Sequence, residues 1–326
     1  MSTRSFDRVA SLWWHAVMET LMPATNDVAT DLFFPEGPVW LPDGTLLVTE
    51  LGGACVTQIG PDGNVEKLSA NGGSPNGLAV GPDGAIYVCN SGGWEFHEVL
   101  GLRIPALDLP ASHSGGRIER IDPASGDVTV LYTQCGGNPL IGPNDLVFDA
   151  QGGMWFTDHG RGQGRVHHNG GVYYATIDGS LIREVLFPVE SPNGIGLSPD
   201  GNRLYVAETH TGRVKAWNVT SPGALDTTSL LPGIGGECLH GFDGVQMLDS
   251  LAVDSAGNVV VATLVTGALS VIAPDGTLLE QWVLGDPMVT NVCFGGPGLT
   301  TAYATLSATG RLVSFEYPRG GLALNY

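Results

Sequence analysis

Short apolar runs recur along the chain, and each of them begins with an acidic or amide residue. Six residues share this opening position: Glu36, Asn76, Asn144, Asn193, Asp249 and Asn291. In the first five copies a glycine follows the opening residue at a distance of eight positions, as from Glu36 to Gly44. Apolar runs bounded by turn residues are typical of β-strands. The pattern therefore predicts six strands, each opened by a side chain that carries an oxygen atom.

A second apolar run follows each turn and ends in another polar residue. These terminal residues lie fourteen or fifteen positions after the opening residues and are Glu50, Asn90, Asp158, Glu208, Thr263 and Thr305. Turns such as Pro42-Asp43-Gly44 reverse the chain tightly, because proline restricts φ and glycine accepts a positive φ. The second strand is thus expected to return antiparallel and to end beside the opening residue.

The repeat predicts an all-β, six-bladed β-propeller. Its period of roughly 40 to 65 residues, with several strands in each unit, is typical of propeller blades. We expect residues 31–326 to form this single domain and residues 1–30 to form an N-terminal segment, with a short helix over residues 7–22. The innermost strands of a propeller line its central channel. The six opening residues should therefore converge at one rim of that channel.

Composition and charge narrow the class of partner. The 48 glycines, 21 prolines and 14% charged residues favour many short strands over helices. A net charge of −19 disfavours nucleic acid and anionic membranes, so a small-molecule substrate is expected. The first residues lack a secretory pattern and no run reads as a membrane span, which predicts a cytoplasmic location. The oligomeric state stays open.

Convergent carboxylate and amide oxygens suggest a site for one divalent cation. Oxygen ligands suit Ca²⁺ first, with Mg²⁺, Mn²⁺ or Zn²⁺ as alternatives. A cation in an open channel polarises a carbonyl group and lowers the pKa of a water molecule, and a neighbouring carboxylate can take the proton. This chemistry predicts hydrolysis of an ester or lactone. The alternative is an ion that only stabilises the propeller.

Other polar and aromatic residues are candidates for contact with the substrate. Asn76 and Asn291 belong to the opening set, while His159 and His210 follow the ends of two second strands. Trp94 lies in a long insertion at residues 92–116, which we interpret as a cover for the channel mouth.

Five sequence motifs occur together in a fixed order. They are Glu36-Gly37-Pro38-Val39-Trp40, Asn144-Asp145-Leu146, Trp155-Phe156-Thr157-Asp158, residues 191–201 (SPNGIGLSPDG) and Thr290-Asn291-Val292. From about Phe34 to Leu312 the chain resembles the SMP-30/gluconolactonase/regucalcin/luciferin-regenerating enzyme (LRE-like) family. The resemblance implies one catalytic divalent cation in the channel, held by Glu36, Asn144, Asn193 and Asp249. It also implies that Asp249 acts as general base.

Two departures from the family pattern bear on the substrate. Sugar-lactone members commonly carry an arginine two residues before the ligand equivalent to Asn144, where this chain has Gly142. Ser250 follows Asp249 where many members have glycine, which resembles the drug-responsive lactonases and adds a hydroxyl group to the site. We therefore expect a metal-dependent hydrolase that opens a lactone other than a simple sugar lactone. A phosphotriester hydrolase of the same propeller type and a non-catalytic calcium-binding propeller remain alternatives.

Overall fold

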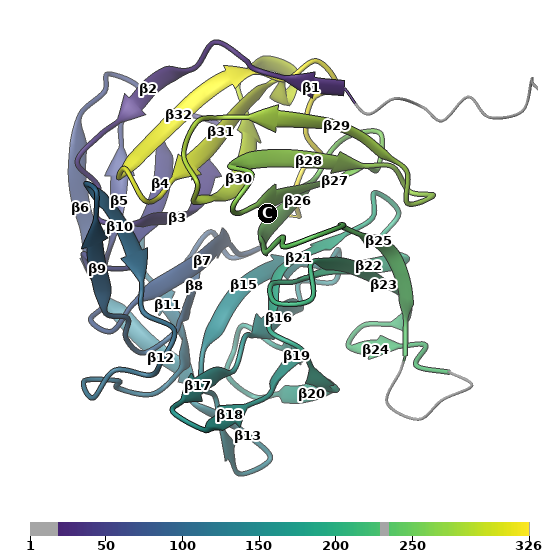
Figure 1. Ribbon diagram of the computed structural model, residues 1–326. Coiled ribbons are helices and arrows are strands. Elements are labelled where there is room, and N and C mark those ends of the chain that lie inside the picture. The colour runs from purple at the N-terminus through teal and green to yellow at the C-terminus, as the bar shows by residue number, and fades with distance from the viewer. Residues whose placement is uncertain (1–18, 229–234, 326) are drawn as a thin grey trace, which may run out of the picture.

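The computed structural model describes residues 19–228 and 235–325 and forms a ring of six sheets around a central axis (Figure 1). The innermost strands of the sheets are β3 (Pro35–Trp40), β7 (Pro75–Val80), β15 (Pro143–Phe148), β21 (Pro192–Leu197), β26 (Leu248–Val253) and β30 (Val289–Gly295). This arrangement confirms the predicted all-β, six-bladed propeller.

The remaining strands complete each blade from the inside outward. The second strands are β4 (Leu46–Glu50), β8 (Ile86–Asn90), β16 (Met154–Asp158), β22 (Arg203–Glu208), β27 (Val259–Thr263) and β31 (Thr301–Leu306). The third strands are β5 (Cys55–Ile59), β11 (Arg117–Ile121), β19 (Gly170–Ala175), β23 (Arg213–Ser221), β28 (Ala268–Ile272) and β32 (Arg311–Glu316). The fourth strands are β6 (Val65–Ala70), β12 (Val128–Tyr132), β20 (Ile182–Val189), β25 (Glu237–Gly241), β29 (Leu278–Val283) and β2 (Asn26–Ala29).

Helix is almost absent from the described part of the chain. A short 3-10 turn, η1 (Pro297–Leu299), precedes β31, and the small strands β13 (Gln134–Cys135), β14 (Asn138–Pro139) and β24 (Ala224–Leu225) decorate the outer edges. None of the helical residues described forms a segment long and apolar enough to cross a membrane.

The N-terminal side of the chain closes the ring. Strand β2 pairs with β32 and so completes the blade built from the C-terminal strands, while β1 (Glu19–Leu21) pairs parallel with β29. Residues 26–29 thus belong to the propeller, although the sequence pattern placed residues 1–30 before it, because short exposed strands carry little apolar periodicity. Residues 7–18 of the expected helix lie outside the described residues, and Glu19–Leu21 form a strand instead.

A β-bulge lies next to the opening residue of each innermost strand. In the β3–β4 pair, Glu36 faces Thr49 and Val39 faces Leu47, so β3 contains one extra residue at this point. The same three-versus-two shift recurs in β7, β15, β21 and β26, whereas in β30 the shift lies between Val289 and Asn291, before the opening residue. A bulge re-aims the adjacent side chain, and here it does so at one level of the channel in every blade.

Neighbouring blades approach each other closely at these bulges. A Cβ atom added to Gly194 would lie 2.4 Å from the backbone nitrogen of Leu251 in the next blade, and one added to Gly37 would lie 2.7 Å from the carbonyl oxygen of Asn76. Side-chain hydroxyl groups connect neighbouring blades at the same level, since Thr157 Oγ1 donates a hydrogen bond to the Asn193 carbonyl at 2.6 Å. The bulged level therefore leaves no room for larger residues.

We predict that Gly194→Ala lowers the free energy of unfolding by about 1 to 3 kcal/mol, because the added methyl group collides with backbone atoms of the next blade. Urea unfolding at neutral pH measures this change. The matched control is Gly241→Ala in the same blade, where the nearest atom is 3.7 Å from the added Cβ and the residue is exposed. Equal stability losses in both variants would contradict the close-packing argument.

Candidate functional site

The six opening residues meet at one rim of the channel. Five of them are the second residue of their innermost strand, and Asn291 is the third residue of β30. The Asn291 side-chain nitrogen donates to Glu36 Oε2 at 3.0 Å, although the two residues lie 255 positions apart. On another part of the ring, Ser250 Oγ lies 3.5 Å from Asn193 Oδ1. The repeat thus brings side chains from first and last blades into direct contact.

Three carboxyl groups gather at this rim without a basic partner. Burial raises the pKa of Glu36 to about 7 and that of Asp145, the neighbour of Asn144, also to about 7. Burial, together with the negative charge of Glu36, raises the pKa of Asp249 well above its usual value. None of the ion pairs between described residues involves these three groups. The rim therefore gathers carboxyl groups that hold protons more strongly than usual and that form no ion pair with a described basic residue.

Two amide oxygens at the rim lack partners. The Oδ1 atoms of Asn76 and Asn144 are buried and accept no hydrogen bond from any described residue. A buried acceptor without a hydrogen bond destabilises the fold by about 1 to 3 kcal/mol, so such an atom is a candidate for contact with a ligand. The described residues contain no group of three His, Cys, Asp or Glu side chains suited to a metal ion. A cation here would have to use amide oxygens together with carboxylates, which is the donor set that Ca²⁺ accepts.

The residues at the ends of the second strands hold the chain that leads into the opening residues. Asp158 accepts hydrogen bonds from the backbone nitrogens of Ile141, Gly142 and Gly160 at 2.7, 2.8 and 2.9 Å. Asn144 lies two residues after Gly142, so Asp158 positions its approach to the rim. These residues support the ring from behind and do not enter it.

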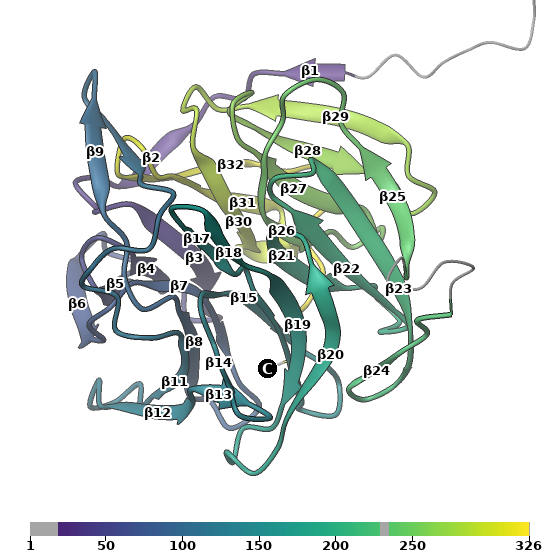
Figure 2. The same cartoon turned by 60° about the horizontal axis from the view of Figure 1, so that its bottom comes forward.

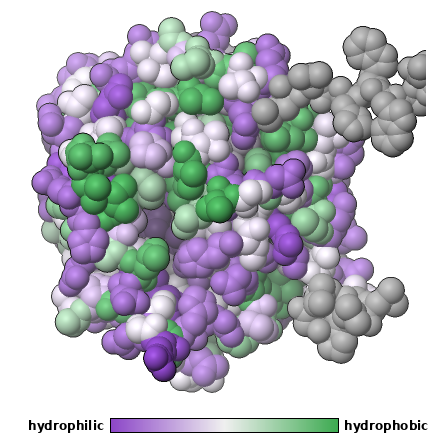
Figure 3. Space-filling model, in the orientation of Figure 1, coloured by the Kyte–Doolittle hydropathy of each residue, from purple (hydrophilic) through white to green (hydrophobic). Residues whose placement is uncertain are grey.

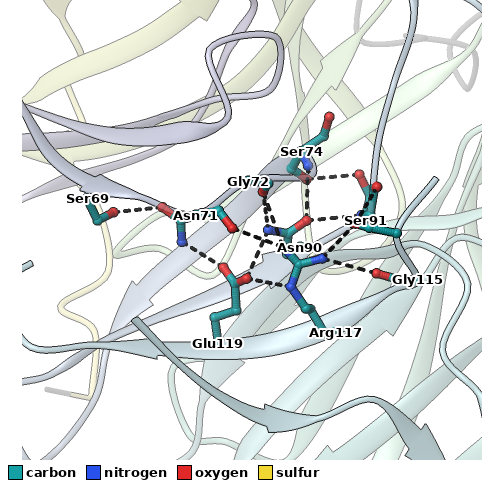
Figure 4. Close-up of polar contacts among 11 residues, drawn as sticks. Ser69, Asn71, Gly72, Ser74, Asn90, Ser91, Gly115, Arg117 and Glu119 are labelled. Carbon is teal, nitrogen blue, oxygen red and sulfur yellow. Dashed lines mark hydrogen bonds and ion pairs between the residues drawn. The ribbon is translucent and has the colours of Figure 1, made fainter. Parts of the chain in front are cut away.

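In the second blade, Asn90 likewise accepts hydrogen bonds from the backbone before the opening residue, and it belongs to a larger polar network (Figure 4). Its Oδ1 accepts from the backbone nitrogens of Ser74 and Gly92, both at 3.0 Å. Its Nδ2 donates to Glu119, which is 1% exposed and forms an ion pair with Arg117 at 2.6 Å. The network joins the segment before Asn76 to the start of the insertion at residues 92–116.

The two candidate histidines lie behind the ring. The Asn193 side-chain nitrogen donates to Thr209 Oγ1 at 3.2 Å, and Thr209 Oγ1 lies 3.3 Å from His159 Nε2. The ring of His210 packs against that of His159 with 5.6 Å between centroids, and His210 is exposed. Burial lowers the pKa of His159 to about 3, so its imidazole is neutral at pH 7. His159 therefore orients Asn193 through Thr209 without contacting the ring itself.

Two hairpins cover part of the same rim. The insertion at residues 92–116 forms β9 (Phe96–Val99) and β10 (Leu102–Pro105), and β17 (Arg161–Gln163) pairs with β18 (Val166–His168). Figures 1 and 2 place both hairpins on one face of the ring, and the C-terminus on the other. The Arg161 guanidinium stacks on the Trp94 ring, 3.3 Å from its centroid, and joins the two insertions.

A cavity of about 480 Å³ lies beside these hairpins and is lined by Trp94, Phe33 and Phe96, among others. Ser74, two residues before Asn76, lines its inner side. Figure 3 shows this face, where hydrophobic side chains gather over β9 and β10 next to a hollow. The cavity therefore combines aromatic walls with a position close to the ring.

A family model described as SMP-30/gluconolactonase/LRE-like region matches residues 34–308. The chain belongs to this family. The matched region of this SMP-30/gluconolactonase family member contains all six opening residues.

Individual relatives agree with the assignment. The chain is 28% identical over 300 residues to a gluconolactonase of Zymomonas mobilis, covering 84% of this chain and 76% of the relative. It is 28% identical over 248 residues to lactonase drp35 of Staphylococcus saprophyticus, covering 76% and 68%. The solved calcium-binding protein regucalcin from Agrobacterium tumefaciens superposes with a TM-score of 0.73 at 18% identity, covering 95% and 99% of the two chains. A gluconolactonase from Xanthomonas campestris gives a TM-score of 0.70 at 23% identity, covering 90% and 89%.

Sequence reasoning missed two residues of the rim in this family member. Asp145 belongs to one of the sequence motifs, but the repeat does not single it out. Only its burial beside Glu36 and Asp249 identifies it as a third carboxyl group of the rim. Thr209 links Asn193 to His159, a contact between positions 50 apart for which the repeat offers no signal. Of the candidates for substrate contact, Ser250 and Asn291 lie in the ring, whereas Trp94 lies in the rim cavity.

We predict that Asn144→Leu does not lower the melting temperature of the metal-free protein but reduces the stabilisation that Ca²⁺ provides. Without metal the melting temperature stays the same or rises, because the variant removes a buried oxygen that has no partner. Excess Ca²⁺ at about one hundred times its dissociation constant should stabilise the unmodified protein by about 2.7 kcal/mol and the variant much less. Calorimetric melting after EDTA treatment, followed by CaCl₂ addition, measures both effects. Asn64→Leu, at an exposed turn, should keep the full response; an undiminished Ca²⁺ response in Asn144→Leu would exclude that ligand.

Proposed function

We propose that this protein is a metal-dependent lactonase whose substrate is not a simple sugar lactone. The observation that carries the proposal is the rim itself, where buried carboxylates without basic partners face amide oxygens without hydrogen bonds. The names of two relatives, a gluconolactonase and a lactonase, support the same reaction class.

The residues proposed to hold the cation are Glu36, Asn144, Asn193 and Asp249. Two carboxylates would balance a dication, and Asn144 Oδ1 has no competing partner. A bound cation supplies Lewis acidity toward a carbonyl oxygen of the substrate. The Asn193 amide nitrogen donates to the Thr209 hydroxyl, and its amide oxygen lies 3.5 Å from Ser250 Oγ. Ca²⁺ is the proposed ion, because its oxygen preference matches this donor set.

Asp249 is the proposed general base. Its carboxylate lies within electrostatic range of Glu36 and Asp145 at the ring, so it can accept a proton from a water molecule bound there. Attack of that water on the lactone carbonyl breaks the ring C–O bond, and the proton passes from Asp249 to the leaving oxygen. Ser250, Asn76 and Asn291 supply hydrogen bonds around the reacting group.

The aromatic side chains beside the rim cavity are the basis of the proposed preference for an apolar lactone, and Ser74, Ser112 and Ser114 also line that cavity. A Cβ atom added to Gly142 would lie 3.4 Å from Arg161 Cγ, so Arg161 already fills the space over this position. The guanidinium of Arg161 is 2% exposed and is held by Trp94 and two backbone carbonyls, which keeps it away from polyhydroxylated substrates. Phe33 and Phe96, with 5.3 Å between ring centroids, offer apolar surface instead.

We predict that Asp249→Asn lowers kcat for lactone opening by at least about 10²-fold, because the amide cannot accept the proton. A pH-indicator assay over aliphatic, aromatic and sugar lactones, with and without EDTA, measures the rates. Asp243→Asn, at an exposed position six residues away, is the control and should retain activity.

Three outcomes would count against this function. Full activity of Asp249→Asn, or turnover insensitive to EDTA, would exclude the mechanism. Hydrolysis of a phosphotriester without hydrolysis of any lactone would assign the site to phosphotriesters. A Ca²⁺-dependent rise in melting temperature without any turnover would identify a non-catalytic calcium-binding propeller.

We predict that Phe96→Ala lowers kcat/KM about tenfold for aryl- or alkyl-substituted lactones, because it removes apolar contact from the rim cavity. The value for gluconolactone should change little. Val99→Ala, in the same hairpin but 52% exposed, is the matched control. A uniform loss on all lactones in Phe96→Ala would indicate a general structural role for Phe96.

A further inference from the structure

A second and larger cavity occupies the channel on the other side of the ring. It measures about 650 Å³ and extends from Gly37, Asp145 and Asn291 to the turns at the opposite rim, where Pro42 and Gly201 line it. Its volume is that of a pocket for a drug-sized molecule. The rim cavity is lined by Phe96 of β9, whereas residues 322–325 line the larger cavity, and Figures 1 and 2 place β9 and the C-terminus on opposite faces of the ring.

The repeat itself explains why this part of the channel is hollow. The third residue after each of the first five opening residues has a small or short branched side chain, and all five line the cavity: Val39, Ala79, Val147, Gly196 and Ala252. Larger apolar side chains, among them Trp40, Phe148 and Phe294, contribute further wall. The cavity is therefore wide as well as apolar.

The C-terminal segment crosses the open end of this cavity. Leu322 donates its backbone N–H to the Val253 carbonyl at 3.0 Å, and the Asn325 side-chain nitrogen donates to the Phe148 carbonyl at 3.0 Å. Both acceptors belong to innermost strands, so residues 322–325 lie against the channel and line it. Figures 1 and 2 show the C-terminus at this face of the ring.

Water is a poor occupant of such a space. Ordered water needs several polar partners, and the apolar part of the cavity wall does not supply them. Trp155 is fully buried and lines the cavity, and its indole N–H has no hydrogen-bond partner among the described residues. An apolar molecule with one acceptor atom would displace water, contact the apolar wall and accept a hydrogen bond from the Trp155 indole N–H.

We propose that this cavity is a second ligand site that binds a neutral, apolar small molecule with a hydrogen-bond acceptor. The negative charge of Asp149 and Asp200 in the lining and the net charge of −19 disfavour an anionic ligand. The apolar walls disfavour a charged ligand of either sign, which leaves a neutral one. The site shares Asp145 and Asn291 with the ring of opening residues but lies on the other side of that ring from the rim cavity, and ligand binding there does not depend on the proposed reaction.

Fluorescence titration with Nile red, a neutral apolar dye with a carbonyl acceptor, tests the proposal on the full chain. The unmodified protein should bind the dye with a blue-shifted emission and with energy transfer from tryptophan. Val147→Trp fills the cavity and should weaken binding at least tenfold. Val130→Trp is the matched control, because Val130 is 49% exposed on the outer strand β12, and it should bind like the unmodified protein.

Ala252→Met fills the cavity from another wall and decides the question if Val147→Trp does not fold, as judged by circular dichroism. Absence of dye binding to the unmodified protein would overturn the proposal. Equal binding by the filled variants and by Val130→Trp would also overturn it, because the dye would then occupy another surface. Trp94→Ala should leave the dye affinity unchanged. A loss of dye affinity in this variant would show that the dye binds in the rim cavity and would overturn the proposal.

Discussion

The gathering of six oxygen-bearing side chains around one axis, five of them buried and Asp249 half-buried, is the constraint on which the rest of the structure depends. Burying a carboxylate or an amide is unfavourable unless it finds partners, and the rim satisfies only some of them. Hydrogen bonds such as the one from Asn291 to Glu36 offset part of this cost. The remaining oxygens, above all Asn144 Oδ1, have no partner among the described residues. A stable fold that retains this arrangement is best explained by a positively charged ligand.

The scaffold holds this unfavourable arrangement by bringing the backbones very close together. The bulge beside each opening residue and glycines such as Gly194 allow neighbouring blades to meet, and threonine hydroxyls then join them by hydrogen bonds. Behind the ring, Asp158 and Asn90 hold the incoming segments by their backbone nitrogens. The polar residues at the strand ends thus act on the backbone, which leaves the opening side chains free for chemistry.

Much of this architecture could be predicted from the sequence, because it rests on local and periodic signals. The alternation of apolar runs with Pro-Asp-Gly turns predicted the two inner strands of each blade, and turn glycines such as Gly44 and Gly257 have the positive φ that the turns require. Strands β1 and β2 escaped prediction, since they are short, exposed and paired with distant strands. The stacking of Arg161 on Trp94 was equally inaccessible, because it joins two insertions that share no repeat.

The sequence by itself determined the six-fold repeat and the identity of the residues at its polar position, because both follow from spacing along the chain. Only the tertiary structure decided the burial, the pKa values and the contacts of those residues. The raised pKa values of Glu36 and Asp145 arise from desolvation by other blades, and the contact from His159 through Thr209 to Asn193 joins different strands. The apolar cavity beyond the ring likewise exists only when the blades close around it. Burial and contact between distant segments are properties of the closed ring, and no single repeat contains them.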